Sequence, residues 1–207
     1  MADLLYSPEG PSEQELRLVG DVAGKRVLDL GCGDGSAAVT LAQRGAVVIA
    51  IDTSEARIAL GRRRGEEAEV RLDWHAGDLA DLAFLRADSV DLVFSAFAVD
   101  TVDDSARVYR QVERVLKPNA PFVFSLAHPF ALCVDEGRVA RPYLDAGPVM
   151  VERWGEAVTA YPRSLSETFA DLSRAGFRVD TLLELATTSA NASVPSTVVW
   201  RARKEGA

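Results

Sequence analysis

The sequence predicts an α/β fold: a doubly wound, mostly parallel sheet of seven strands that ends in an antiparallel C-terminal hairpin. Apolar runs with the length of buried strands alternate with segments of helical pattern along most of the chain. The last two predicted strands, 177–185 and 196–203, are separated by too few residues for the helical crossover that parallel neighbours require. These two strands should therefore pair antiparallel. We expect the 207 residues to form a single domain, 1–207.

Each predicted strand is an apolar or alternating run between turn signals. The fourth, VDLVFS, is nearly all apolar, as a strand buried on both faces of a parallel sheet should be. The third alternates instead and is followed by Gly77-Asp78. In chain order, the predicted strands are 27–30, 47–51, 70–75, 90–95, 121–127, 177–185 and 196–203.

The predicted helices have recognisable ends. Ser54 caps the start of the third helix and Gly65 follows its end. Gly45 and Gly176 stop two other helices, and Pro118 ends the fourth. In chain order, the predicted helices are 12–19, 36–44, 54–64, 103–116 and 164–175.

Three glycines at alternate positions follow the first strand, in the order Asp29, Gly31, Gly33, Gly35. Glycine lets the backbone pass close to a ligand where a Cβ would collide. The second strand ends in Asp52, whose carboxylate can accept hydrogen bonds from both hydroxyls of a ribose. This layout is that of a half-site for an adenosine-bearing cofactor.

The glycine spacing and Asp29 indicate which cofactor binds. Dinucleotide sites use G-x-G-x-x-G, but the third glycine of that pattern is replaced here by Ser36. A carboxylate at Asp29 would repel a pyrophosphate, whereas it suits a cationic ligand. S-adenosyl-L-methionine carries an ammonium and a sulfonium, so these residues favour it over a nicotinamide dinucleotide.

The segment resembles motif I of the class I S-adenosylmethionine-dependent methyltransferases, which have a Rossmann-like fold. Residues 77–79, 90–93 and 112–118 are similar to later motifs of that family, and the resemblance covers roughly residues 22–204. Asn119-Ala120 replaces two glycines that commonly follow the last of these motifs. Residues 127–130 and 161–166 resemble the small bacterial type 11 group, similar to ubiquinone and menaquinone methyltransferases. Pro162 stands there in place of a histidine.

The resemblance implies the residues that bind the cofactor. The glycines would pass under its methionine portion and ribose, with Cys32 inside the turn, and Asp52 would hold the ribose. Asp78 would take the adenine amino group, although it could instead cap a helix. Ser95 would lie along the cofactor, although it could instead bond to backbone at the strand end. The predicted cofactor-binding residues are Asp29, Gly31, Cys32, Gly33, Gly35, Asp52, Thr53, Gly77, Asp78, Leu79, Ser95 and Ala96.

The predicted catalytic residues are His128, Tyr161 and Asp100. His128 opens the segment after the fifth strand, and a neutral imidazole there suits removal of a proton from an alcohol or ammonium. The alternative for His128 is a structural histidine bonded to a loop carbonyl. Asp100 lies past the fourth strand, where it could face substrate. The spacing of these residues gives no recognisable metal-ligand pattern, so we expect no metal.

Two segments are expected to determine the methyl acceptor. Residues 1–20 would form an N-terminal lid segment, and residues 128–163 a substrate-side insertion, long and irregular over 128–162. The aromatic residues there offer flat apolar walls, which favours a small-molecule acceptor with a hydroxyl or an amine. These aromatic residues are Phe130, Tyr143, Trp154 and Tyr161.

Composition narrows the possible partners and the compartment. A net charge of −8 argues against nucleic-acid binding, and no leader or apolar run long enough to span a membrane is seen. We therefore expect a cytoplasmic protein, monomeric or homodimeric, with no membrane partner. Two other functions remain open: a cofactor-binding partner subunit without catalysis, and an NAD-dependent oxidoreductase.

Overall fold

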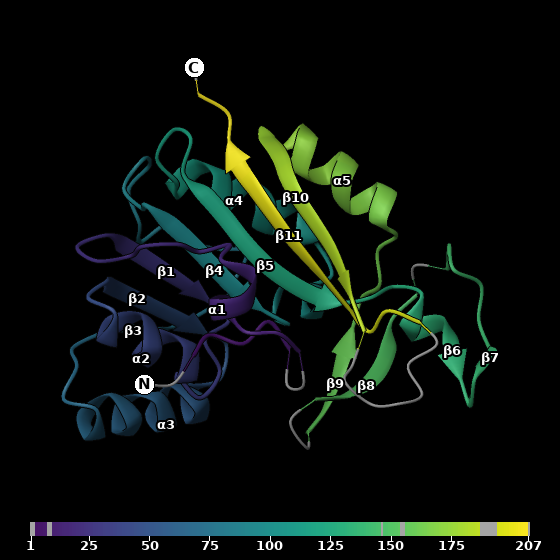
Figure 1. The fold of residues 1–207 in the computed structure, drawn as a ribbon, viewed down its shortest axis with the longest axis horizontal. Coiled ribbons are helices and arrows are strands. Elements are labelled where there is room, and N and C mark those ends of the chain that lie inside the picture. Colours follow the sequence, from purple (N-terminus) through teal and green to yellow (C-terminus); the bar gives the residue numbers. More distant parts are fainter. Residues whose placement is uncertain (1–2, 8–9, 146, 154–155, 187–193, 207) are drawn as a thin grey trace.

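A computed structural model describes residues 3–7, 10–145, 147–153, 156–186 and 194–206. It contains one sheet of seven strands in the order β10-β11-β5-β4-β1-β2-β3 (Figure 1). The strands from β3 to β5 are parallel, and β11 runs antiparallel to both β5 and β10. The predicted fold class is therefore confirmed. The strands are β1 (Arg26–Leu30), β2 (Val47–Asp52), β3 (Asp73–Ala76), β4 (Leu92–Ala96), β5 (Pro121–Ala127), β10 (Phe177–Leu185) and β11 (Thr197–Lys204).

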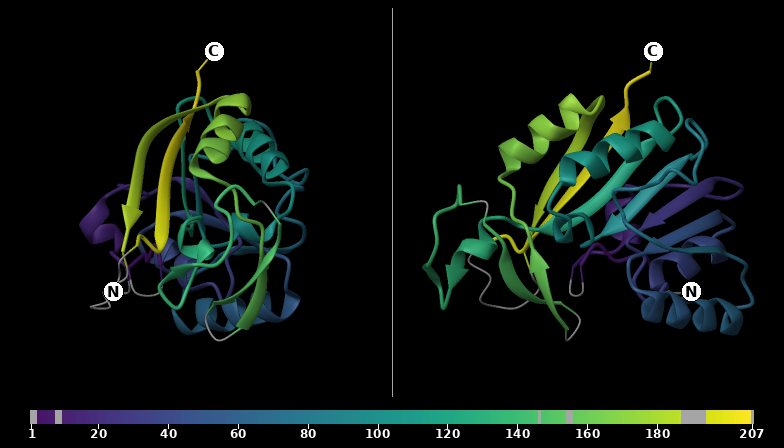
Figure 2. Two further views of the ribbon diagram at one scale, coloured as in Figure 1. Left: turned by 90° about the vertical axis from the view of Figure 1, so that its right-hand side faces the viewer. Right: turned by 180° about the vertical axis from the view of Figure 1, so that it is seen from behind.

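Helices cover both faces of this sheet, and each face has its own apolar core. α1, α2 and α3 lie on the face seen in Figure 1, whereas α4 and α5 lie in front of the sheet when it is viewed from behind in Figure 2. In α4, for example, Val108, Val112 and Val115 are buried and recur at helical spacing, so they form one apolar stripe that faces the sheet. The helices are α1 (Glu13–Leu16), α2 (Ser36–Gln43), α3 (Glu55–Glu67), α4 (Ser105–Val115) and α5 (Leu165–Arg174).

Two helix boundaries differ from prediction. α3 does not end before Gly65 but continues to Glu67, since Gly65 faces Leu72 and a Cβ there would lie 3.2 Å from its Cδ1 atom. The glycine thus serves packing rather than termination. The first helix is also shorter than 12–19, because Arg17 adopts a left-handed conformation with φ of 52°.

The third strand begins at Asp73 rather than at residue 70, since only 73–76 pairs with β2. The chain then reaches β4 without a helix, through turns that place Leu79, Leu82 and Leu85 in the core. The alternative interpretation of Asp78, that it caps a helix, is therefore wrong. Its carboxylate instead accepts the amide of Ala80 in a local turn, at 2.8 Å.

The prediction that the stretch 128–162 is irregular is wrong. This stretch contains two small hairpins. Strand pairing across the chain gives it this structure, which local turn residues do not reveal. One hairpin pairs β6 (Val134–Asp135) with β7 (Arg138–Val139), and the other pairs β8 (Val149–Arg153) with β9 (Glu156–Ala160). Short 3-10 turns occupy η1 (Val99–Thr101) and η2 (Ala131–Cys133).

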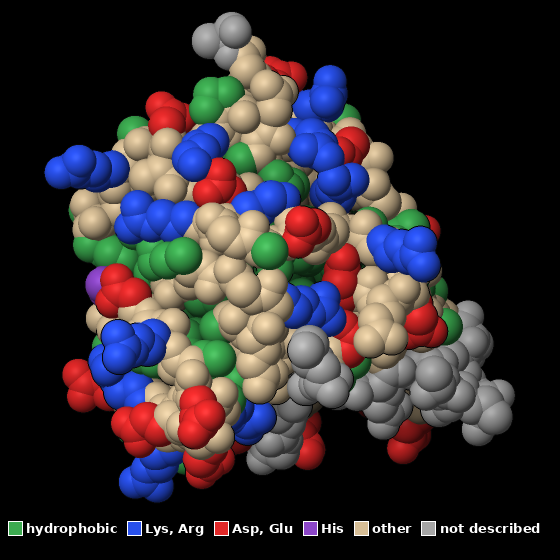
Figure 3. Space-filling model, turned by 60° about the vertical axis from the view of Figure 1, so that its left-hand side comes forward, with side chains coloured by type: hydrophobic (Ala, Val, Ile, Leu, Met, Phe, Trp, Pro, Cys, Tyr) green, Lys and Arg blue, Asp and Glu red, His purple; other side chains and the backbone are tan. Residues whose placement is uncertain are grey.

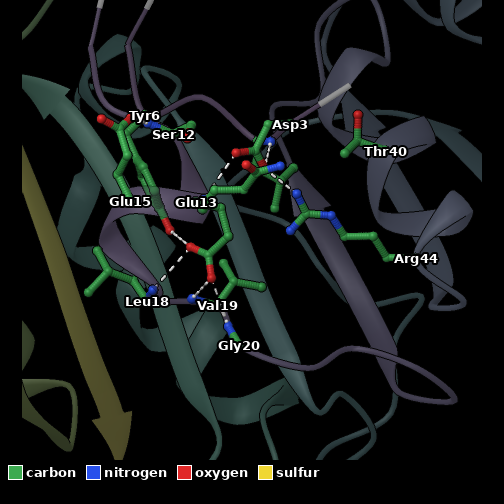
Figure 4. Close-up of polar contacts among 12 residues, drawn as sticks. Asp3, Tyr6, Ser12, Glu13, Glu15, Leu18, Val19, Gly20, Thr40 and Arg44 are labelled. Atoms are coloured by element: carbon green, nitrogen blue, oxygen red, sulfur yellow. Dashed lines mark hydrogen bonds and ion pairs between the residues drawn. The ribbon is translucent and has the colours of Figure 1, made fainter. Parts of the chain in front are cut away.

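A buried carboxylate organises the N-terminal segment (Figure 4). Glu13 accepts hydrogen bonds from the hydroxyl of Tyr6 and from the amides of Leu18, Val19 and Gly20. All three amides are about 2.9–3.0 Å from the carboxylate, so it satisfies the backbone of the turn after α1. Burial and the Glu13 carboxylate raise the pKa of Tyr6, which keeps its hydroxyl protonated as the donor.

The same segment covers the central strands. Leu4 and Tyr6 are fully buried, and the ring of Tyr6 meets that of Phe94 on β4 edge to face, with centroids 5.9 Å apart. Asp3 forms an ion pair with Arg44 beyond α2. The described part of residues 1–20 is therefore a fixed layer on one face of the sheet.

Among the described residues, no helix is long and apolar enough to cross a membrane. Figure 3 shows one face of the molecule, on which basic and acidic side chains are interspersed.

The first prediction concerns Glu13. Glu13→Gln should lower the free energy of unfolding by about 1–3 kcal/mol, because hydrogen bonds to a buried charged acceptor are weakened or left unmade. Urea unfolding of the variant and the wild type measures the change. Glu66→Gln, at an exposed position on α3, is the control and should stay within about 0.5 kcal/mol. Equal stability of the two variants would contradict this role for Glu13.

Candidate active site

The predicted site residues gather along the carboxyl ends of β1, β2, β3 and β4. Neighbouring parallel strands end at the same edge, which is where ligands bind in open α/β sheets. Asp29 lies near the end of β1 and Asp52 is the last residue of β2. The structure thus brings together side chains from segments that the sequence separates by helices.

Backbone hydrogen bonds fix the glycine turn to the end of β2. The amides of Gly31 and Cys32 donate to the carbonyl of Ile51, at 2.8 and 2.9 Å. Gly31 has φ of +78°, and a Cβ on it would lie 2.1 Å from the Cβ of Ala98. Glycine is therefore required there both by backbone conformation and by close packing.

The other two glycines differ in their surroundings. Gly33 has φ of +54°, and a Cβ on it would meet only the Arg57 guanidinium, at 4.0 Å. Apart from its chain neighbours, no other heavy atom among the described residues lies within 4 Å of that position, so its turn is not filled by packing. Gly35 has φ of +78°, and a Cβ there would lie 2.6 Å from the ring of Trp74 and 2.8 Å from Gly61. Gly35 thus has a packing reason of its own, between α2 and α3.

Asp52 is buried and joins the turn to the start of α3. Its Oδ2 atom accepts the amide of Gly33 and its Oδ1 atom the amide of Ser54, both at 2.9 Å. These contacts fix the orientation of the carboxylate and leave further lone pairs for a ligand. Thr53 is exposed beside it.

Asp29 is buried, and its Oδ2 atom has no hydrogen-bond partner among the described residues. Burial, followed by the nearby carboxylates of Asp52 and Asp34, raises the pKa of Asp29 to about 7. A cation placed against this oxygen would supply the missing partner. The ammonium of S-adenosylmethionine has that chemistry, so the residues present fit this cofactor.

The segment after β3 lies against the same turn. The amide of Gly77 donates to the carbonyl of Asp52 at 3.0 Å. Leu79 is buried and approaches Gly31, with its Cδ1 atom 3.4 Å from where a Cβ on Gly31 would lie. Asp78 is exposed. These contacts put the predicted adenine-side residues next to the predicted ribose-side residue.

Beyond β4, the hydroxyl of Ser95 is fully buried and donates to the carbonyl of Leu30 at 2.7 Å. This is the alternative expected for Ser95, a hydrogen bond from its hydroxyl to the backbone at the end of the strand. Ala96 is half-buried at the strand end, and Phe97 follows with φ of 54°. Its amide donates to the carbonyl of Ser125 at 3.0 Å, which fixes Phe97 at the edge of the sheet.

Asp100 faces an arginine that the sequence did not pair with it. Both of its oxygens bind the guanidinium of Arg153, at 2.7 and 2.6 Å, and both side chains are buried. Arg153 also donates to the carbonyl of Phe97 at 2.9 Å and lies over its ring, 5.1 Å from the centroid. The pair thus joins hairpin β8–β9 to the end of β4.

His128 is buried and both of its ring nitrogens are engaged. Nδ1 accepts the amide of Phe130 at 3.2 Å, so Nε2 carries the proton and donates to Glu184 of β10 at 2.7 Å. The carboxylate therefore fixes the tautomer and orientation of the ring. Glu184 was not predicted, because its strand is far along the chain from His128.

Tyr161 follows β9, and its amide donates to the carbonyl of Asp100 at 2.7 Å. The side chain is half-buried. It helps line a small cavity between α4, α5 and the end of β5, whose other apolar walls include Val99, Tyr109, Leu126 and Leu132. Of the predicted aromatic walls, Trp154 lies outside the described residues.

Comparison with known proteins identifies the family. A model of the methyltransferase domain, type 11, matches residues 28–124. A solved S-adenosylmethionine-dependent methyltransferase from Mesorhizobium loti is 30% identical, and the alignment covers 92% of this chain and 96% of that one, with a TM-score of 0.76. The chain belongs to the class I S-adenosylmethionine-dependent methyltransferases. S-adenosylmethionine is accordingly the cofactor, and the nicotinamide alternative loses its support.

Other relatives are consistent with this family. A solved methyltransferase from Listeria monocytogenes shares the fold with a TM-score of 0.78, at 24% identity over 94% of this chain and 98% of that one. A ubiquinone biosynthesis O-methyltransferase from Hahella chejuensis is 40% identical over 102 residues, which are 49% of this chain. That match spans 43% of the relative, and matches to such curated relatives cover less than half their length. The family model ends before His128.

The second prediction follows from the raised pKa of Asp29. Without cofactor, the folded protein binds more protons than the unfolded chain between about pH 4 and pH 7, so its stability should fall as pH rises through this window. Asp29→Asn removes that titration. Relative to wild type, it should therefore gain about 3 kcal/mol of stability from pH 4.5 to pH 8.

Urea unfolding across this pH range measures the difference. Asp135→Asn, at an exposed position on β6, should run parallel to wild type at every pH. If the stability of Asp29→Asn also changed with pH in parallel with wild type, the raised pKa of Asp29 would be contradicted.

The third prediction concerns Asp52. Asp52→Ala should weaken the binding of S-adenosylhomocysteine by about 1.5–3 kcal/mol, the range for losing hydrogen bonds to a charged group. Calorimetric titration of wild type and variant provides the measurement, with Asp135→Ala as the control that should bind like wild type. Unaltered affinity in Asp52→Ala would remove Asp52 from the cofactor site.

Proposed function

We propose that this protein transfers the methyl group of S-adenosylmethionine to a hydroxyl of a small apolar molecule. The observation that carries the proposal is the carboxyl edge of the sheet, where the cofactor-side acids and glycines lie at the ends of β1 and β2, and Phe97 and Tyr161 lie beyond β4. The hydroxyl is favoured over an amine because the curated relatives are named ubiquinone biosynthesis O-methyltransferases.

The acceptor side consists of the hairpins and turns between β5 and α5. Phe130 and Tyr143 contact each other there, with ring centroids 6.4 Å apart. Tyr161 and Leu132 border the small cavity next to the end of β5. Aromatic and aliphatic side chains of this kind suit a small aromatic or aliphatic acceptor. The mixed charges on the face shown in Figure 3 and the net charge of −8 do not favour nucleic acid.

Methyl transfer is an in-line displacement at a sulfonium, and bound S-adenosylmethionine supplies both the methyl group and the good leaving group. The protein contributes mainly alignment. Asp52 and the glycine turn would orient the ribose, and Asp29 the ammonium. Phe97, held by its amide and by Arg153, would wall the site beside β4.

His128 is our candidate for accepting the proton of the hydroxyl, with Glu184 as the group that orients it. The 3.2 Å contact from the Phe130 amide is the longer of its two hydrogen bonds, so Nδ1 is the nitrogen that an acceptor would reach. Glu184 would then stabilise the imidazolium. Asp100 contacts Arg153 rather than open space, and we assign it to positioning. Tyr161 remains a candidate for contact with the acceptor.

The proposed function is tested by methyl transfer from labelled S-adenosylmethionine to matched panels of phenols, alcohols and amines, with products identified by mass spectrometry. Methylation of a hydroxyl supports the proposal. Methylation of amines alone would change the acceptor class. Cofactor binding without transfer to any acceptor would favour the alternative, a partner subunit without catalysis.

The fourth prediction concerns His128. With an acceptor in hand, His128→Gln should lower kcat by about 100-fold or more, because general-base catalysis contributes at least that much. Its affinity for S-adenosylhomocysteine should change less than about twofold, since the residue does not hold the cofactor. Glu184→Gln should cause a smaller loss of kcat.

The control is His75→Gln, at the other histidine of the chain, which stacks on Phe84 with ring centroids 4.2 Å apart. It should retain wild-type kcat. A kcat for His128→Gln equal to that of His75→Gln would leave His128 with a structural role only.

A further inference from the structure

Hairpin β8–β9 is connected to two separate sides of the site. Arg153 and Glu156 are direct cross-strand partners near the hairpin's free end. Arg153 contacts Asp100 and Phe97 beyond β4, whereas Glu156 forms an ion pair with Arg57 on α3, beyond β2. Figure 1 shows β8 and β9 beyond the carboxyl ends of β4 and β5. The hairpin therefore spans the edge where the cofactor residues lie.

One face of the hairpin is turned toward the molecule. Along β8, Val149 and Val151 are half-buried and Arg153 is buried, while Met150 and Glu152 between them are exposed. This alternation is that of a two-stranded ribbon packed on one side. The inward face therefore ends, at the free end of the hairpin, in the two charged side chains that reach the rest of the protein.

The two connections differ in burial. The side chains of Arg153 and Asp100 are 8% and 7% exposed, and three hydrogen bonds hold the guanidinium. Those of Arg57 and Glu156 are 30% and 61% exposed. An exposed pair separates readily in water, whereas breaking a buried pair leaves an uncompensated charge. The Arg153 side is therefore a fixed anchor, and the Arg57 side can open.

Arg57 lies beside the glycine turn. Its Nη1 atom is 4.0 Å from where a Cβ on Gly33 would be, and the amide of Gly33 donates to Asp52. The Arg57–Glu156 contact thus lies next to the residues that would hold the ribose. A ligand bound on the glycine turn would therefore lie next to the Arg57–Glu156 ion pair.

We propose that Arg57 and Glu156 are positioning residues that hold hairpin β8–β9 over the glycine turn and so slow the release of the cofactor. The proposal rests on the cofactor site described above, and it goes beyond that site because neither residue belongs to the glycine turn or to the acids of the strand ends. The pair acts through the hairpin: when it separates, the hairpin stays anchored by Arg153 but no longer covers the turn.

The test is the dissociation rate of S-adenosylhomocysteine from the full chain, in a double-mutant cycle. Arg57→Ala and Glu156→Ala should each raise this rate about three- to fivefold, the scale of an exposed ion pair. The double variant should dissociate no faster than the single variants, because both remove one interaction. The exchanged pair, Arg57→Glu with Glu156→Arg, should return the rate to within about twofold of wild type.

Two controls accompany the cycle. Arg174→Ala removes an exposed arginine that pairs with Asp171 on α5, and it should leave the rate unchanged. In about 1 M salt, where exposed charges are screened, the single variants and wild type should converge.

Unchanged rates in both single variants, with wild-type binding intact, would overturn this proposal alone. Additive effects in the double variant would also overturn it, since Arg57 would then contact the cofactor independently of Glu156. Absence of wild-type binding would overturn the cofactor assignment and this proposal together. Failure of methyl transfer with binding intact would affect the proposed function and leave the pair in place.

Discussion

The hydrogen bonds that join the glycine turn to the end of β2 are the constraint on which the site depends. Gly31 and Cys32 donate to Ile51, and Gly33 donates to the carboxylate of Asp52. They fix where the chain leaves β1 and where the acid of β2 points. The open side of Gly33 and the unpartnered oxygen of Asp29 follow from this arrangement. The geometry of the candidate cofactor site is thus a consequence of how two parallel strands end side by side.

The segment proposed to face the acceptor is organised by carboxylates that bind groups far along the chain. Asp100 binds Arg153 and Glu184 binds His128, so each connects the inserted segment or the last strands to the end of the central sheet. Asp100 and Arg153 are both buried, and their pairing offsets the cost of burying each charge. The insertion therefore has a defined position relative to β4 and β5, although its sequence reads as an irregular loop.

Much of the fold could be predicted from local pattern. Apolar runs gave the strands, Ser54 and Ser164 cap α3 and α5, and the short connection before 196–203 required an antiparallel hairpin. The errors fall where tertiary contacts override a local signal. Gly65 continues a helix because Leu72 needs the space of its missing Cβ. Hairpin β8–β9 exists because two strands pair, and pairing partners are not encoded by turn residues alone.

The sequence by itself determined the order of strands and helices, the edge at which the site lies and the cationic character of its cofactor, because these depend on residue type and short spacing. Only the tertiary structure decided which charges meet. Arg153 lies 53 residues from Asp100, and Glu156 lies 99 residues from Arg57. Such contacts depend on the packing of whole elements rather than on any periodicity along the chain. The contacts of hairpin β8–β9 are therefore a property of the folded molecule.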